Sequence, residues 1–213
     1  MLGLMKSTEF NKRVPKQKFY ENMNMTPAMK KVFAEQIKIV YWKNKIAPTT
    51  MNLAKSKDVM EIEVLEIRLN TMHFNEKILR QIDKVIPYHI LFLLEFDGKY
   101  QAWISYKEIV NDTVKVNQYY HTAWVDEESL PCKLEGLDMN AVYENFVRQV
   151  AGAELSVDEN TNLKEDIELA EEKKQIEKQI KVLQAKIRKE KQFNRKVELN
   201  NELKRLRKLC NKI

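Results

Sequence analysis

The spacing of apolar residues changes twice along the first seventy residues. After Thr26, which can cap a helix, and Pro27, which fits the first helical turn, apolar residues recur every three or four positions. This pattern predicts an amphipathic helix that ends before Pro48. Between residues 58 and 69 the period falls to two and changes parity near Val64, which predicts a strand with two apolar faces or with a bulge.

The middle of the chain predicts one more helix and three further strands. Residues 74–86 have helical spacing, and the short apolar run at 90–94 suits a central strand. The pair at 97–98, Asp-Gly, predicts a tight hairpin turn, because glycine tolerates a positive φ. Residues 100–106 then form the return strand, and alternation over residues 115–125 predicts a fourth strand.

A last helix completes a globular domain over residues 26–153. Asp138 can cap this helix, which runs to about Val150, and Gly152 ends it. The order helix, strand, helix, three strands, helix predicts an α+β fold: a small, mainly antiparallel sheet with packed helices. The polar residues before this domain, 1–25, mix bases with aromatics and are expected to form a basic arm that packs its aromatics locally.

The C-terminal part predicts a long helical or coiled-coil tail. An acidic linker is expected over residues 154–162, and residues 163–213 contain neither glycine nor proline. Apolar residues alternate by three and four along a seam, which is typical of an interface between helices. The candidate interface residues are Ile176, Ile180, Leu183, Ile187, Leu199, Leu203 and Leu206.

The seam shifts its register between Gln192 and Arg195. The chain therefore either turns back as a helical hairpin or continues as one helix that presents a different face, closing against a second copy. Folding back brings an acidic first arm toward a basic second arm and favours the hairpin. Acids at the start and bases at the end complement the dipole of a continuous helix, so both arrangements stay open.

The net charge of +6 conceals basic ends and an acidic middle. Basic ends are the usual electrostatic footprint of a protein that binds a polyanion such as DNA or RNA. Bases that only solubilise exposed helices give the same pattern. The candidate nucleic-acid contacts are Lys12, Arg13, Lys16, Lys18, Arg188, Lys189, Lys191, Arg195 and Lys196.

Few motifs point to a reaction. None of the four glycines belongs to a phosphate-binding loop, and neither the three histidines nor the two cysteines have metal-ligand spacing, so we expect no cofactor and no metal. The first residues do not form a signal peptide, and no apolar stretch is long enough to cross a membrane. A cytoplasmic protein without membrane contact is expected.

Strand carboxylates offer the one alternative with catalytic chemistry. Glu66 shares strand parity with apolar positions, so it could bind a divalent metal together with Glu95, while Lys107 assists a water or a phosphate. In the simpler interpretation Glu66 pairs with Arg68 or Lys107, and Glu61 and its neighbour at 63 face solvent. The usual Asp then Glu-x-Lys signature of such nucleases is absent.

Several separated segments resemble a known family. Residues 7–20, 61–67 and 82–92, together with the tail segment at 190–200, are similar to the bacterial domain-of-unknown-function family 4391. The resemblance implies an accessory role beside helicases and DNA methyltransferases in antiviral defence or restriction-like loci. It supplies no catalytic residues.

Together these observations predict a non-enzymatic accessory or adaptor subunit of such a DNA-handling complex. The α+β domain would dock a protein partner, a helicase or a methyltransferase subunit. The tail would mediate assembly, including a homodimer, and contact DNA or RNA. The alternative is a metal-dependent nuclease subunit that uses Glu66, Glu95 and Lys107.

Overall fold

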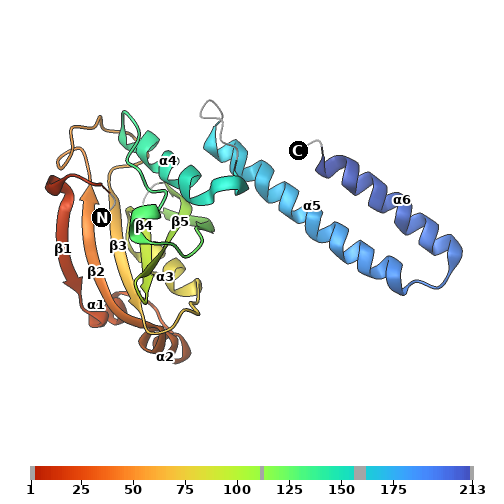
Figure 1. Ribbon diagram of the computed structural model, residues 1–213, viewed down its shortest axis with the longest axis horizontal. Helices are drawn as coiled ribbons and strands as arrows, with labels where there is room; N and C mark the ends of the chain where they lie inside the picture. Colours follow the sequence, from red (N-terminus) through yellow and green to blue (C-terminus); the bar gives the residue numbers. More distant parts are fainter. Residues whose placement is uncertain (1–2, 111–112, 156–161, 212–213) are drawn as a thin grey trace. The chain divides into compact units, whose positions relative to one another are not determined.

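The computed structural model describes residues 3–110, 113–155 and 162–211 and consists of two compact units, Met1–Gly152 and Ala153–Ile213 (Figure 1). The boundary falls at Gly152, the residue that the sequence marks as a helix end. Along its described residues, the chain has no helix that is both long and apolar enough to cross a membrane.

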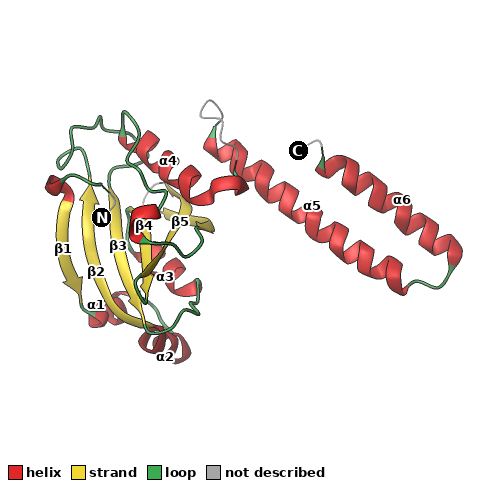
Figure 2. Cartoon of the chain, in the orientation of Figure 1, coloured by secondary structure: helices red, strands yellow, loops and turns green. Residues whose placement is uncertain are grey.

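The first unit contains a six-stranded sheet covered by helices (Figure 2). Its elements are η1 (Lys6–Thr8), β1 (Glu9–Val14), α1 (Lys16–Asn22), α2 (Pro27–Gln36), β2 (Ile37–Ile46), β3 (Ile62–Leu69), α3 (Lys77–Val85), β4 (His89–Phe96), β5 (Lys99–Val110), β6 (Thr113–His121), η2 (Glu127–Ser129) and α4 (Met139–Ala151). A short helix, η3 (Gly152–Glu154), begins at the last residue of this unit. The fold is α+β, as predicted.

The sheet is mixed, with its strands in sequence order from β1 to β6. Of the strands that the structure describes, only β3 and β4 pair in parallel with each other, because α3 lies between them in the chain and returns it to the end of the sheet where β3 began. Every other neighbouring pair is antiparallel. Seven of the eight residues of β3 are buried, which confirms a strand with two apolar faces. The irregularity near Val64 lies on the partner strand, between Trp42 and Asn44 of β2.

Each face of the sheet has its own helical cover. On one face, Phe19 of α1, Phe33 of α2 and Ile82 of α3 pack with residues such as Ile67 and Phe92 in a continuous core. The other face is contacted by α4, which packs against β5 and β6. Burial of these apolar side chains supplies the main driving force for folding of the unit.

Local signals placed several elements correctly. The Thr26 hydroxyl accepts a hydrogen bond from the Met29 amide at 3.2 Å, with Pro27 in the first turn of α2. Asp138 accepts one from the Ala141 amide at 2.9 Å and begins α4. The turn at Asp97 and Gly98 has two positive φ angles, 49° and 75°, which suit a two-residue hairpin between β4 and β5.

Two predictions about the N-terminal part were wrong. The helix that starts at Pro27 ends at Gln36 rather than continuing toward Pro48, and residues 37–46 form β2. This segment is rich in isoleucine, valine and aromatic residues, which favour strands. Residues 1–25, expected to form a separate arm, contribute β1 to the edge of the sheet and α1 to its cover.

The second unit contains two helices, α5 (Leu163–Lys189) and α6 (Phe193–Cys210), which contact each other along their lengths (Figure 1). The chain turns back between Lys189 and Phe193, so the hairpin is the arrangement observed and the single continuous helix is not. Asn162 caps α5 by accepting a hydrogen bond from the Lys164 amide at 2.9 Å. The predicted acidic linker, 154–162, lies mostly outside the described residues.

Candidate functional site

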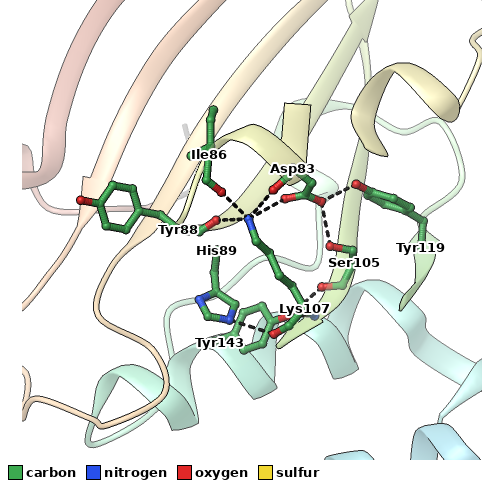
Figure 3. Close-up of polar contacts among 8 residues, drawn as sticks. All are labelled: Asp83, Ile86, Tyr88, His89, Ser105, Lys107, Tyr119 and Tyr143. Carbon is green, nitrogen blue, oxygen red and sulfur yellow. Dashed lines mark hydrogen bonds and ion pairs between the residues drawn. The ribbon is translucent and has the colours of Figure 1, made fainter. Parts of the chain in front are cut away.

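Among the described residues of the first unit, the most deeply buried ion pair joins α3 to β5. Asp83 has no exposed surface and Lys107 is 2% exposed, and the Lys107 Nζ lies 3.3 Å from the Asp83 Oδ1 (Figure 3). Two charges in a protein interior are costly unless further hydrogen bonds satisfy them. The surroundings of the pair supply those bonds.

The ammonium of Lys107 caps the C-terminal end of α3. Besides the carboxylate, its Nζ donates to the backbone oxygens of Asp83 at 2.8 Å, Ile86 at 2.6 Å and Tyr88 at 2.6 Å. The last carbonyls of a helix lack partners within the helix, and a cation there is favoured by the helix dipole. Three ammonium hydrogens facing four oxygens leave no donor unsatisfied, so this geometry suits the charged form of Lys107.

The Asp83 carboxylate has two further donors from the sheet. The Ser105 hydroxyl donates at 2.8 Å, and the Tyr119 hydroxyl of β6 donates to the same oxygen. Burial raises the pKa of Asp83, while Lys107 and the two hydroxyls oppose that rise. Burial likewise lowers the pKa of Lys107, and Asp83 opposes that change. Burial and the nearby Asp83 carboxylate raise the pKa of Tyr119.

A bulge in the pairing of β5 with β6, with its extra residue on β6, is bridged by a side chain from the opposite face of the sheet. The pairing of β5 with β6 shifts its register between Ser105 and Lys107. The Tyr143 hydroxyl of α4 accepts a hydrogen bond from the Lys107 amide at 2.8 Å and donates to the Ser105 carbonyl at 2.7 Å. One hydroxyl therefore satisfies two backbone groups beside the bulge, where the ladder is irregular. Burial raises the pKa of Tyr143 well above its usual value.

His89, the first residue of β4, lies against this bridge. Its Nε2 is 3.0 Å from the Lys107 carbonyl, and its ring packs on Tyr143 with centroids 4.2 Å apart. Because a carbonyl only accepts, Nε2 carries the ring hydrogen and Nδ1 has a free lone pair. Among the described residues, Nδ1 is the one buried side-chain nitrogen or oxygen without a hydrogen-bond partner. Burial lowers the pKa of His89 to about 4, so the ring is neutral at pH 7.

A cleft of about 210 Å³ opens beside His89. It is lined by Lys57, Asp58, Met60, Glu61, Pro87, Tyr88, His89 and Ile109. Among the described residues, no group of three His, Cys, Asp or Glu side chains is arranged to hold a metal ion. The cleft is therefore lined by charges of both signs, from Lys57, Asp58 and Glu61, beside a buried and neutral His89.

The residues of the nuclease alternative do not come together as one site. Glu66 pairs with Arg68 at 2.8 Å and with Lys43 at 3.3 Å, and Glu95 lies 3.9 Å from the same Arg68. One guanidinium thus lies near both carboxylates, which competes with a metal ion for them. Lys107 belongs to the Asp83 network instead. The simpler interpretation, pairing of Glu66 with Arg68, is confirmed.

Glu63 was expected to face solvent, and that expectation was wrong. Its side chain is 4% exposed and accepts a hydrogen bond from the Trp42 indole nitrogen. Glu61 is nearby and pairs with Lys45 at 2.7 Å. Burial, and next the negative charge of Glu61, raise the pKa of Glu63 to about 7. The alternation of polar and apolar residues in this strand suggested that Glu63 faces solvent, and it did not reveal that other side chains cover this part of β3.

The predicted nucleic-acid contacts of the N-terminal part lie on β1 and α1. Lys12, Arg13 and Lys18 are exposed, and the Lys12 ammonium lies 4.6 Å from the centre of the Phe10 ring. Lys16 is half-buried and donates to the carbonyls of Ile37 and Ala34, the latter at 3.4 Å. Three of these four bases are therefore free to face a polyanion, and Lys16 holds the end of α2.

The remaining predicted contacts surround the turn of the hairpin. The five residues Arg188, Lys189, Lys191, Arg195 and Lys196 are all exposed. We call them the basic tip. Arg195 pairs with Glu198 at 3.2 Å. The basic tip combines several cations within a few residues, as polyanion-binding surfaces do.

The predicted interface residues face one another inside the hairpin. Ile176, Leu183 and Leu203 are at most 8% exposed. The other four, Ile180, Ile187, Leu199 and Leu206, are half-buried. Within this chain the seam thus joins α5 to α6, and part of its surface stays accessible.

Most of the buried network was missed from the sequence. Asp83 follows Ile82 on a helix whose apolar face was recognised, and an acid beside that face is a weak signal of a buried partner. Tyr143 likewise follows Val142 on the apolar face of α4. No spacing rule connects these residues with Ser105 and Tyr119, which lie on other elements.

The fold and its buried site define a small α+β protein with a mixed sheet, to which a helical hairpin is appended. The family model described as "Domain of unknown function (DUF4391)" matches residues 2–209, nearly the whole chain, so the chain belongs to this family. Comparison with curated proteins gave no match. Comparison with solved structures gave none either.

Proposed function

We propose that this chain is an accessory or adaptor subunit of a nucleic-acid-handling complex. The α+β unit docks a protein partner, and the helical hairpin mediates assembly and contacts DNA or RNA. The observation that carries the proposal is the hairpin itself, a compact unit of its own that ends in the basic tip. A helicase or a DNA methyltransferase subunit of an antiviral or restriction-like system is the partner that the family resemblance implies.

Apolar side chains on the outside of the hairpin support an assembly role. Val182, Phe193, Val197 and Leu209 are between 43% and 76% exposed. Together with the half-buried seam residues, they offer surface that a further helix can cover, as in a coiled coil with a partner or with a second copy. Each fully buried side chain of this kind contributes about 1.5–3 kcal/mol.

The basic tip supports contact with a nucleic acid. Phosphate contacts by lysine and arginine release counterions, so the affinity falls steeply with salt. Contacts of this kind position a protein on the sugar–phosphate backbone of the nucleic acid and do not distinguish one base sequence from another. We therefore expect binding that is weak, independent of sequence and sensitive to salt.

The proposal is tested by fluorescence anisotropy with a labelled 20-base-pair duplex at several salt concentrations. The variant reverses three charges of the tip, Lys189→Glu, Lys191→Glu and Lys196→Glu. Its control reverses three exposed charges of the first unit: Lys30→Glu, Lys31→Glu and Lys38→Glu. The tip variant should lose most of the affinity and flatten the slope of log K against log salt by about 0.9 per lost phosphate contact.

Equal losses of affinity in both variants would show that net charge alone drives the binding and would overturn the role of the tip.

Light scattering coupled to size exclusion then measures assembly, with the chain alone and with candidate partner subunits. Addition of Mg²⁺ or Mn²⁺ to the duplex sample tests the nuclease alternative, which predicts cleavage that Glu66→Ala abolishes. Strand cleavage of this kind would replace the adaptor proposal.

A further inference from the structure

The turn of the hairpin presents an aromatic ring to solvent. Phe193 is the first residue of α6 and the only aromatic residue that follows Phe146 in the sequence. It is 76% exposed, more than any other large apolar residue in the described part of the hairpin. Figure 1 shows the turn where α5 ends and α6 begins, away from the start of α5. Packing of the hairpin therefore does not explain an aromatic residue at this position.

The ring of Phe193 lies within the basic tip. Three residues of the basic tip precede Phe193 in the chain and two follow it. The one acid between them, Glu190, accepts a hydrogen bond from the Gln192 amide at 2.8 Å, so its carboxylate is engaged with the turn itself. The turn thus combines one exposed ring with several exposed cations.

Positive charge continues from the tip along one side of α6. Lys196, Lys204 and Lys208 are exposed and are separated by multiples of four residues, so they follow the same side of the helix. The acids of this helix, Glu198 and Glu202, are offset from that series by two positions and lie on a different side. A chain of phosphates that starts at the tip can therefore continue along α6 without meeting these carboxylates.

Two other occupants fit this surface less well. A helix that binds a membrane surface needs a broad apolar face, and the apolar face of α6 packs on α5 through residues such as Leu203. A second copy of the chain would bring two basic tips together, and like charges repel. A nucleic acid supplies both negative charge and flat rings that stack on an aromatic side chain.

We propose that the basic tip binds single-stranded nucleic acid, with an unpaired base stacked on Phe193 and with phosphates bound by the tip and by Lys204 and Lys208. This inference rests on the proposed contact with a nucleic acid and specifies which form of it is recognised. Bases inside a duplex already stack on one another, so they cannot stack on Phe193. A duplex would then bind through its phosphates alone, whereas a single strand adds the stacking contact.

Three fluorescent ligands separate stacking from charge. They are an oligo-dT strand of about 20 nucleotides, an abasic strand of the same length, and a duplex of the same length. The abasic strand carries the phosphates of oligo-dT without its bases. Fluorescence anisotropy with the full-length chain measures each affinity at one salt concentration. The wild type should bind oligo-dT roughly tenfold more tightly than the abasic strand, as expected for one stacked base.

Phe193→Ala should abolish the preference for oligo-dT and leave the affinities for the abasic strand and the duplex unchanged. Phe193→Trp retains an aromatic face and should keep the preference. Val197→Ala is the matched control, since it truncates an exposed apolar residue one turn further along α6, and it should change none of the affinities. Because both positions are exposed, the variants should fold normally, which circular dichroism checks.

Stacking on Phe193 is refuted if the wild type binds oligo-dT and the abasic strand equally, or if Phe193→Ala keeps the preference. The proposed contact with nucleic acid still stands in that case, provided that the charge-reversed tip variant loses its affinity for the duplex. Both are refuted if the tip variant binds all three ligands as the wild type does. Binding to vesicles of phosphatidylserine and phosphatidylcholine, with no binding to any of the three ligands, would also overturn both.

Discussion

The Asp83–Lys107 network and the seam of the hairpin show two different ways of stabilising a protein of this size. The network joins two charges and several backbone groups in the interior of the sheet. The seam joins Ile176 and Leu183 of α5 to Leu203 of α6 through apolar contact alone. In the network each group depends on a particular partner, whereas a seam residue needs only apolar neighbours.

This difference matters for how each region responds to change. Removing one member of a buried ion pair leaves an uncompensated charge, so the loss is large and abrupt. Removing part of an apolar side chain leaves a cavity whose cost depends on how far the neighbours relax. The chain allows both to be measured separately, because its three tryptophans, Trp42, Trp103 and Trp124, all lie in the first unit. Tryptophan fluorescence therefore reports unfolding of the first unit, whereas far-ultraviolet circular dichroism reports unfolding of both units.

The largest expected effect is that of Lys107→Met. It leaves the Asp83 carboxylate buried without its cation and should lower the free energy of unfolding by about 3–5 kcal/mol. Urea unfolding followed by tryptophan fluorescence measures it. The control is Lys99→Met on the same strand, which breaks an exposed pair with Asp126 and should cost less than about 1 kcal/mol. Similar losses for both lysines would refute a special role for the buried pair.

The next effect is that of Leu183→Ala in the seam. It should lower the stability of the hairpin by roughly 2–3 kcal/mol, because it removes a side chain that is 6% exposed. The helical signal in circular dichroism should fall at lower urea while the fluorescence midpoint stays constant. Val182→Ala, on the neighbouring exposed position, should change little. A parallel shift in fluorescence would contradict the independence of the two units.

Tyr143→Phe tests the bridge across the bulge. Loss of the hydroxyl leaves the Lys107 amide and the Ser105 carbonyl without this partner, and the expected loss of stability is about 1–2 kcal/mol. Tyr20→Phe is the control, since it keeps the ring contact with Phe33. If both variants unfold at the same urea concentration as the wild type, water replaces the bridge without cost.

The smallest effect is a pH dependence from Glu63. Its folded pKa of about 7 exceeds the unfolded value, so the folded state binds the extra proton and stability falls as the pH rises from about 4.5 to 7. His89, with a lowered pKa of about 4, gives the opposite slope between about 4 and 6.5. Glu63→Gln should therefore remove a fall of about 1 kcal/mol between pH 5 and 6, measured as the difference between wild type and variant. If the stability difference between wild type and Glu63→Gln is the same at pH 5 and at pH 6, Glu63 is ionised in the folded protein over this range.

Much of the fold could be predicted because its signals are local. A cap such as Thr26 or Asp138, the Asp97-Gly98 turn and the register break near Gln192 each depend on a few adjacent residues. The failure at β2 has the same origin. Gln36, Ile37, Val40 and Tyr41 satisfy helical spacing, and the preference of the segment for a strand is realised only through its two neighbours in the sheet.

The buried network could not be predicted in the same way. Lys107 reaches Asp83 across 24 positions of sequence and Tyr143 across 36. These contacts exist because α3 crosses one face of the sheet and α4 the other, and neither placement is encoded near Lys107 itself. Parallel pairing of β3 and β4 sets Arg68 opposite Glu95, so that this guanidinium lies near both Glu66 and Glu95, a relation that alternation alone does not fix.

The bridge at the bulge has a consequence for the exchange of a single backbone hydrogen. The Lys107 amide donates to a side chain of α4 instead of a neighbouring strand, while the Lys107 ammonium holds the end of α3. Deuterium can replace that amide hydrogen once its bond to the Tyr143 hydroxyl opens, as it does when α4 moves away from β5. The exchange rate at residue 107 is thus a reporter of motion in a helix that is measured on a strand. Through its amide and its ammonium, this one residue contacts helices on both faces of the sheet.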